Sequence, residues 1–279
     1  RVTRCKRRGC KTRDTAASGE MLQDAWTWLL AEASPRVVDT WIPFGLFVVT
    51  YWVGGFALLA LECPWAMPWA RAIKCQPSAP PMPWADVRKI GKRVGLQQLT
   101  VYPAAQWALR LLVRGRCSFA PALPTAAEAV SHLLFFGLMA EIYFYHVHRL
   151  LHHPRLYPWV HKIHHEFTAP ISLEAMYFHP VESVLNIGVL LSGPLCLGSH
   201  ITLVYAFTVI AVLNVLVHHC GHEVPLDSPP FFGSMTHQHD YHHKVFNRNF
   251  GVIGICDWLY GTRAGYDEYH ARWWRARRR

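Results

Sequence analysis

Three absences limit what this sequence can encode. None of the eight cysteines forms a Cys-x-x-Cys pair, which excludes a zinc ribbon and leaves no recognisable disulfide framework, so reduced thiols are expected. Only 16% of the residues are charged although the net charge is +10, which is unusual for a soluble protein. No acidic residue lies among the first thirteen, seven of which are Lys or Arg, and the chain ends in RWWRARRR.

The positive charge at both ends has two interpretations. Nucleic acid is one, but the long uncharged runs between the ends favour a membrane whose anionic lipids face the cytosol. We therefore predict a bilayer as partner and no nucleic acid. The sequence begins at Arg1 without Met, as is expected of a fragment or a processed form.

The uncharged runs predict membrane helices. Residues 40–61 contain no charge and are long enough to cross a hydrocarbon layer of ~30 Å, although Gly54 and Gly55 leave a re-entrant path open. Residues 97–113, interrupted by Arg110, predict a weaker span or an interfacial helix. Three full crossings before residue 148 would place the two basic ends on opposite sides, so one of these two segments is expected to be re-entrant or interfacial.

The second half of the chain continues this pattern. A helix from residue 126 leads to the first histidine cluster, and the uncharged run 183–222 has Gly193, Pro194 and Gly198 near its middle. This run predicts a helical hairpin that returns its end to the side it left. The predicted fold class is all-α, a polytopic membrane helical bundle with its histidine-rich domain on the cytosolic face.

Histidines are spaced as metal ligands. The stretch HRLLHHPRLYPWVHKIHH, residues 148–165, contains six of them, at intervals that place side chains on one helix face. Two later clusters repeat such intervals. The members of the three clusters are His148 and His152 with His161, His164 and His165; His218, His219 and His222; and His239, His242 and His243.

The number of imidazoles indicates the metal. Structural or catalytic zinc needs only three or four protein ligands, whereas these clusters offer about ten. Two metals with open positions are what iron needs in order to bind and activate dioxygen. A soluble diiron protein would use Glu with Glu-x-x-His, but here only histidines occur at the spacing of metal ligands. The apolar surroundings predict a lipid substrate.

These boxes resemble a known family. The HxxxH, HxxHH and later HxxHH boxes between apolar hairpins are similar to the membrane fatty acid hydroxylase and sterol desaturase superfamily, over residues 126–269. Within it, HRLLHH, HKIHHEF and the Tyr two residues before His-Pro resemble the methylsterol monooxygenases. Charge and hydropathy predict a tail and interfacial helix at 1–38, spans with a Pro-rich linker at 39–125 and a basic tail at 271–279. The resemblance implies a diiron domain at 126–270.

The resemblance also implies an enzyme. It would be an oxygen-dependent diiron monooxygenase of the endoplasmic reticulum membrane that oxidises a C-4 methyl group in sterol biosynthesis. Two iron ions would be its cofactors, with electrons from NAD(P)H through a cytochrome b5 and reductase partner. The eleven histidines above would be the ligand set, with the choice between His218 and His219 open, and no separate acid or base is assigned.

Other interpretations remain open. The same boxes could belong to an enzyme with another substrate: a sterol side-chain hydroxylase, a sterol C-5 desaturase, a carotenoid hydroxylase, or a fatty acyl or sphingoid-base hydroxylase. A membrane protein that stores or carries metal is a third class, but the spans contain almost no ionisable residues away from the ligand face to form a path.

The remaining histidines and nearby acids need separate predictions. His132 and His200 belong on the far side of the bilayer and are predicted not to be ligands, and His270 is predicted to be solvated. His179 is either a ligand or a neighbour of one. Three acids near the ligand helices either bind the metals or orient imidazole N–H groups, or else have ordinary surface or capping roles: Glu141, Asp240 and Asp257.

Overall fold

The computed structural model describes residues 8–63, 68–224 and 233–277. Over these residues the chain is helical without strands, so the prediction of an all-α fold is confirmed. The helices in chain order are α1 (Arg8–Glu32), the π-helix η1 (Val37–Trp41), α2 (Ile42–Leu59), the 3-10 helix η2 (Ala60–Glu62), α3 (Pro68–Ala72), α4 (Trp84–Leu99), α5 (Val101–Arg116), α6 (Ala126–Leu151), the 3-10 helices η3 (His161–Glu166) and η4 (Ser172–Met176), α7 (Pro180–Leu197), α8 (Ile201–His218), α9 (Met235–Val245), α10 (Ile255–Leu259) and α11 (Tyr266–Arg277).

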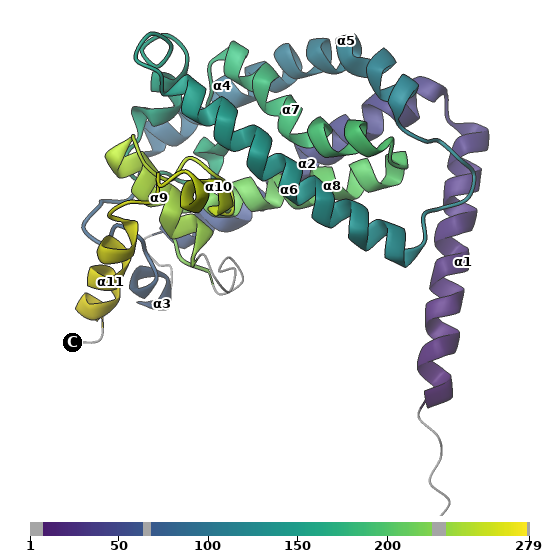
Figure 1. Cartoon of the computed structure of the whole chain (residues 1–279), viewed down its shortest axis with the longest axis horizontal. Helices are drawn as coiled ribbons and strands as arrows, with labels where there is room; N and C mark the ends of the chain where they lie inside the picture. The colour runs from purple at the N-terminus through teal and green to yellow at the C-terminus, as the bar shows by residue number, and fades with distance from the viewer. Residues whose placement is uncertain (1–7, 64–67, 225–232, 278–279) are drawn as a thin grey trace, which may run out of the picture.

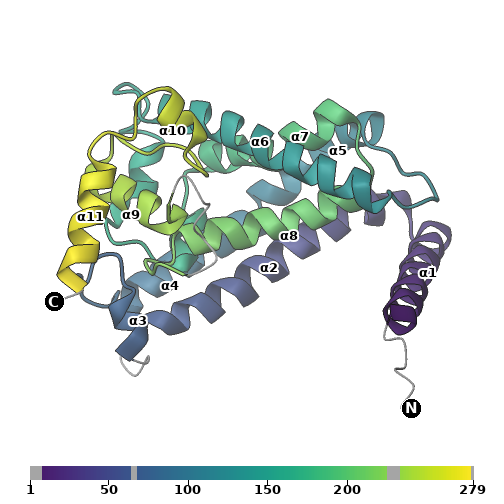
Figure 2. The ribbon, with the colours of Figure 1, turned by 60° about the horizontal axis from the view of Figure 1, so that its bottom comes forward.

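Four helical segments of the described residues are long and apolar enough to cross a membrane. They are Val37–Glu62, which contains α2, and the helices α6, α7 and α8. In the bundle α2 lies along α8, and α6 lies along α7 (Figures 1 and 2). The prediction of a polytopic helical bundle is therefore confirmed.

The glycine pair in α2 serves close packing. The helix runs without a break through Gly54 and Gly55. A Cβ atom on Gly55 would lie 2.6 Å from Cδ2 of Leu173, and one on Gly54 would lie 3.0 Å from Cδ1 of Leu216. These glycines let α2 approach η4 and α8, so neither the pair nor the helix around it forms a re-entrant bend.

Residues 97–113 are divided between two helices. At ~1.5 Å per residue, the 16 residues of α5 span about 24 Å, which is shorter than the ~30 Å hydrocarbon layer. Arg110 and Arg114 of this helix reach the buried carboxylate of Asp39, at 3.4 and 2.8 Å. The length and these ion pairs support the interfacial alternative for this segment.

The α7–α8 hairpin is present as predicted. The chain turns at Gly198, whose φ of 62° lies in the left-handed region that favours glycine. His200 follows at the tip, where its side chain accepts a hydrogen bond from the backbone N–H of Thr202 and so caps α8. The hairpin returns the end of α8 to the end of the molecule where α7 begins.

The two ends of the bundle differ in what covers them. α9, α10 and α11 gather at one end, whereas α1 projects from the opposite end (Figures 1 and 2). The indole N–H of Trp26 in α1 donates to the carbonyl of Ala120, at 2.9 Å. Part of the predicted N-terminal tail, residues 1–7, lies outside the described residues.

Candidate metal centre

Four segments bring histidines to the end of the bundle covered by α9. His148 lies in the last turn of α6 and His152 is its C-cap, while η3 carries the next three histidines of the first cluster. His219 is the C-cap of α8. In α9, the hydroxyl of Ser234 accepts from the backbone N–H of His237 and fixes the start of the helix that carries the last box.

Nine histidines converge in two adjoining groups. Within each group, the nitrogens that could bind a metal all lie within 4.8 Å of one another. The first group is His148, His152, His161, His165 and His242, and the second group is His164, His219, His239 and His243. Spacing alone predicted that these residues would meet, and the fold brings them together from four separate segments.

The outer ring nitrogens fix the tautomers of four of these side chains. Each Nδ1 donates to a backbone carbonyl, which can only accept, so each Nε2 is left with a free lone pair. The four pairs are His148 with Phe250 at 2.8 Å, His219 with Val215 at 2.9 Å, His242 with Arg248 at 2.6 Å, and His243 with Phe167 at 3.2 Å.

Glu182 plays the same part for a fifth ligand candidate. Its Oε1 lies 2.7 Å from Nδ1 of His161, and both side chains are buried. A carboxylate on the outer nitrogen of a metal-binding histidine holds the ring in place and makes the inner nitrogen more basic. No ligand spacing marks Glu182 in the sequence; its one signal is that it is the acid directly before the uncharged run 183–222.

The inner nitrogens face one another. Nε2 of His165 lies 3.1 to 3.2 Å from the Nε2 atoms of His152, His161 and His242, and one N–H could bond only one of them. In the second group, the lone pair of His219 faces the Nε2 atoms of its neighbours at 2.9 and 3.2 Å. Two nitrogens bound to one metal at about 2.1 Å lie about 3 Å apart when the bonds meet near a right angle. A cation in each group fits these contacts.

The electrostatics of the groups agree with this fit. Burial, reinforced by neighbouring imidazoles, lowers the pKa of His152 to about 2 and that of His219 to about 4. The same two causes hold the pKa of His164 and of His239 well below the usual value. These rings are therefore neutral near pH 7, which is the form that binds a metal.

Two predicted ligands lie outside both groups. His218 is buried at the end of α8, with its ring centroid 6.1 Å from that of His239. His222 follows Gly221, whose φ of 69° turns the chain after α8 has ended, and its Nδ1 lies 2.8 Å from the carbonyl oxygen of Cys220. A further predicted residue, His179, caps α7: its side chain accepts a hydrogen bond from the backbone N–H of Val181.

Two of the three predicted acids bond to backbone N–H groups. Glu141 accepts from the N–H groups of Val252, Ile253 and Cys256, at 2.7 to 2.8 Å. Asp257 accepts from the N–H groups of residues 250 and 251, at 2.8 and 2.7 Å. Both therefore hold the loop whose Phe250 carbonyl receives the N–H of His148. Asp240 is buried and accepts from Gln76 at 3.3 Å, and burial raises its pKa to about 7.

Two histidines near α11 pack against aromatic rings. His237 is fully buried, with its ring centroid 4.6 Å from that of His270 and 4.9 Å from that of Trp273. The side chain of His270 is only 20% exposed, so the prediction that it is solvated was wrong. The aromatic side chains that α11 brings against α9 account for the difference.

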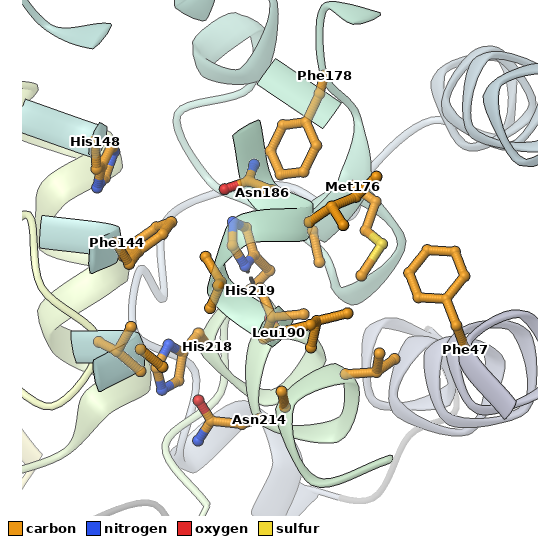
Figure 3. Close-up of a pocket in the computed structure, with 18 of the residues that line it drawn as sticks. Phe47, Phe144, His148, Met176, Phe178, Asn186, Leu190, Asn214, His218 and His219 are labelled. Atoms are coloured by element: carbon orange, nitrogen blue, oxygen red, sulfur yellow. Dashed lines mark hydrogen bonds between the residues drawn. The ribbon is translucent and has the colours of Figure 1, made fainter. Parts of the chain in front are cut away.

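An apolar cavity of about 440 Å³ reaches both groups. Helices α2, α5, α6, α7 and α8 contribute to its lining, which includes Phe47, Phe144 and Leu190 together with His148 and His219 (Figure 3). A separate open hollow of about 640 Å³ is lined by His152, Arg149 and Tyr157. The first histidine group therefore borders both the apolar cavity, through His148, and this hollow, through His152.

The fold and the site define a helical, membrane-type protein with a buried, histidine-rich centre whose two groups have the geometry to hold metal ions. Residues 133–262 match the Fatty acid hydroxylase family model, so the resemblance of the chain to that superfamily is confirmed. The match lies inside the predicted domain 126–270, whose boundaries stay a prediction.

Named relatives agree with the family. The human fatty acid hydroxylase domain-containing protein 2 is 43% identical over 142 residues, 50% of this chain and 40% of the relative. A fatty acid hydroxylase of Mycosarcoma maydis is 32% identical over 81% of this chain and 57% of the relative. Methylsterol monooxygenase 1 of Rattus norvegicus is 36% identical over 48% of this chain and 46% of the relative.

The extent of these matches is partial. The chain spans about half the length of the curated relatives it matches. No solved structure matches it.

Proposed function

We propose that this chain is a membrane-bound non-haem diiron oxygenase that hydroxylates an unactivated C–H bond of a sterol, with C-4 methyl oxidation in sterol biosynthesis as its reaction. One observation carries the proposal: a largely apolar cavity between candidate membrane helices ends on the side chains of both histidine groups. A lipid entering this cavity would present a C–H bond to the metals.

Iron is the metal that we assign to both groups. Nine imidazoles divide into five and four, and a redox metal with open positions suits such a set better than zinc does. Two bound iron ions would supply the dioxygen chemistry that no side chain can perform. The residues hold the metals, the carbonyls and Glu182 orient the rings, and the apolar wall excludes water.

The substrate class rests on the cavity and the relatives. A relative named methylsterol monooxygenase is 36% identical over 138 residues, which favours a sterol. A second candidate is a fatty acyl substrate, because the relative named fatty acid hydroxylase aligns with 81% of this chain. Both are apolar molecules that reach such a cavity from the bilayer.

We also propose the electron supply and the location. Electrons come from NAD(P)H through cytochrome b5, and the open hollow beside His152, with Arg149 at its edge, is exposed to such a donor. The chain resides in the endoplasmic reticulum membrane with the centre on the cytosolic face. The basic residues at the two ends of the sequence support this orientation through the positive-inside tendency.

A microsomal assay tests the reaction. The chain is expressed in a host that lacks its own C-4 sterol oxidase, and 4,4-dimethyl and 4-monomethyl sterols are followed by gas chromatography and mass spectrometry. We expect a loss of C-4 methylated sterol that depends on NADH and oxygen and that His164→Ala abolishes. Unchanged sterols in membranes whose protein holds two irons would overturn the sterol assignment and favour the fatty acyl candidate.

A further inference from the structure

Two polar side chains stand together on the wall of the apolar cavity. Asn214 and His218 both line it, and because they are four residues apart on α8 they lie on the same face, one turn from each other (Figure 3). The side chains around them on this wall are mostly aliphatic or aromatic, such as Leu190 and Phe144.

Neither polar group is satisfied by the protein. In the described parts of the chain, no hydrogen bond reaches the side-chain amide of Asn214, which is half-buried, or Nε2 of His218, whose side chain is only 4% exposed. A buried polar group without a partner destabilises a protein, and polar residues inside membrane helices are rare unless they have a function. The pair is therefore arranged for a partner that enters the cavity.

Helix α8 fixes the position of Asn214 and His218 relative to the two histidine groups. The ring of His218 lies 6.1 Å from that of His239, a member of the second group, and His219 of the same group is the next residue in the chain. Asn214 lies one turn farther into the cavity. A ligand bonded to this pair would hold its neighbouring carbon atoms beside the histidines.

We propose that Asn214 and His218 form a subsite for the hydroxyl group of a lipid alcohol, so that the oxidised carbon lies close to that hydroxyl. An amide and an imidazole can together donate to and accept from one hydroxyl group. This inference rests on the proposed function and sharpens it, because in a sterol the C-4 methyl groups are next to the carbon that carries the 3-hydroxyl. In this assignment His218 binds substrate rather than metal.

The other polar residues of the cavity are placed differently. On α7, Glu182 already bonds to His161 through Oε1, so its role is to hold a ligand ring. Asn186, one turn farther along α7, has no unpartnered histidine beside it on that helix. Within one turn of α8, Asn214 and His218 combine an amide with a buried imidazole nitrogen that has no hydrogen-bond partner among the described residues.

A binding experiment without turnover tests the subsite. Purified, iron-loaded protein in micelles, with no reductant, is titrated with 4,4-dimethyl sterol and with its 3-deoxy analogue, and in parallel with hexadecanol and hexadecane. Wild type is expected to prefer the alcohol by about tenfold, the value of one buried hydrogen bond. Asn214→Leu, which keeps the side-chain size, is expected to bring this preference close to one.

A control and a second variant separate the outcomes. Thr208→Val removes a polar group from the same helix outside the cavity wall, where its hydroxyl bonds to the carbonyl of Val204, and it should keep the full preference. His218→Leu should lose the preference and keep both irons. A fall in iron content in this variant would overturn the substrate role of His218.

Two further results would also overturn the subsite. One is equal binding of alcohol and deoxy compounds by wild type, and the other is an unchanged preference in Asn214→Leu. A preference for hexadecanol but for no sterol would keep the subsite and refute the sterol assignment. A sterol alcohol that binds selectively but is never oxidised in the microsomal assay would keep the subsite and refute the proposed reaction.

Discussion

Histidines lie at both ends of the bundle, and their ring nitrogens bond in different ways. At the hairpin tip, His200 has Nδ1 2.7 Å from the hydroxyl of Thr202 and Nε2 3.0 Å from the carbonyl of Ala120, so both nitrogens have protein partners. At the other end, His242 uses Nδ1 for the carbonyl of Arg248 and turns Nε2 toward His165. Burial alone therefore does not identify a ligand, because both kinds are buried; the use of the second nitrogen does.

The largest effect is expected when an inward-facing histidine is removed from each histidine group. His165→Ala and His239→Ala are each expected to lose iron and to lower turnover by more than about 100-fold, because a direct ligand contributes at least as much as the groups that orient it. His132→Ala at the tip, where Nδ1 lies 2.9 Å from the hydroxyl of Ser199, is the matched control. Iron loss in the control, or full iron in both site variants, would contradict the assignment.

The second prediction concerns the carboxylate behind His161. Glu182→Leu is expected to weaken iron binding by about 10- to 100-fold, because the ring loses the partner that orients it. Glu182→Gln keeps an acceptor and should recover much of the affinity. Competition with a chelator, read by elemental analysis, measures both, and equal affinities for wild type and Glu182→Leu would exclude the positioning role.

The third prediction uses pH. Because the folded-state pKa of His219 is about 4 and that of an unfolded histidine is about 6.5, the unfolded chain binds more protons between these values. The metal-free protein should therefore lose stability as pH falls below about 6.5, by about 1.4 kcal/mol per pH unit for each such histidine. Thermal unfolding in micelles at several pH values measures this slope. In His219→Gln the slope of stability against pH should be smaller by about 1.4 kcal/mol per pH unit, the contribution of one histidine. A slope identical to that of wild type would contradict the pKa shift of His219.

The smallest effect is expected at the tip. His200→Ala removes the cap of α8 and the bond to Ala120, which should lower the free energy of unfolding by about 1 to 3 kcal/mol while iron content stays at the wild-type level. Thermal unfolding and elemental analysis of the same sample give both values. A variant as stable as wild type would show that these hydrogen bonds contribute nothing.

The sequence predicted the parts of the site that depend on local spacing. The HxxHH box of α9 needs only one helix to place His239, His242 and His243 together. For His218 and His222 the same rule assumes a helix through both residues, whereas α8 ends at His218 and Gly221 turns the chain. Where a helix ends, and whether a glycine after it takes a positive φ, depends on capping interactions, which residue spacing does not reveal.

Other features of the site depend on contacts between distant segments. The carbonyl acceptors of Phe250, Arg248 and Phe167 are backbone atoms, so no residue type marks them in the sequence. The glycine pair of α2 was read as a possible break, but its role depends on Leu173 and Leu216 on other elements. Charge and hydropathy predicted the spans, while these tertiary contacts decided how the spans meet.

Metal content of the wild-type protein is the most direct test of the central claim. The chain is purified in detergent from cells grown with iron and zinc both present, and elemental analysis gives the ions bound per chain. Two groups of inward-facing imidazoles predict two irons per chain and little zinc. A chain that binds no metal, a single ion or two zincs would contradict the account of this end of the bundle as a diiron centre.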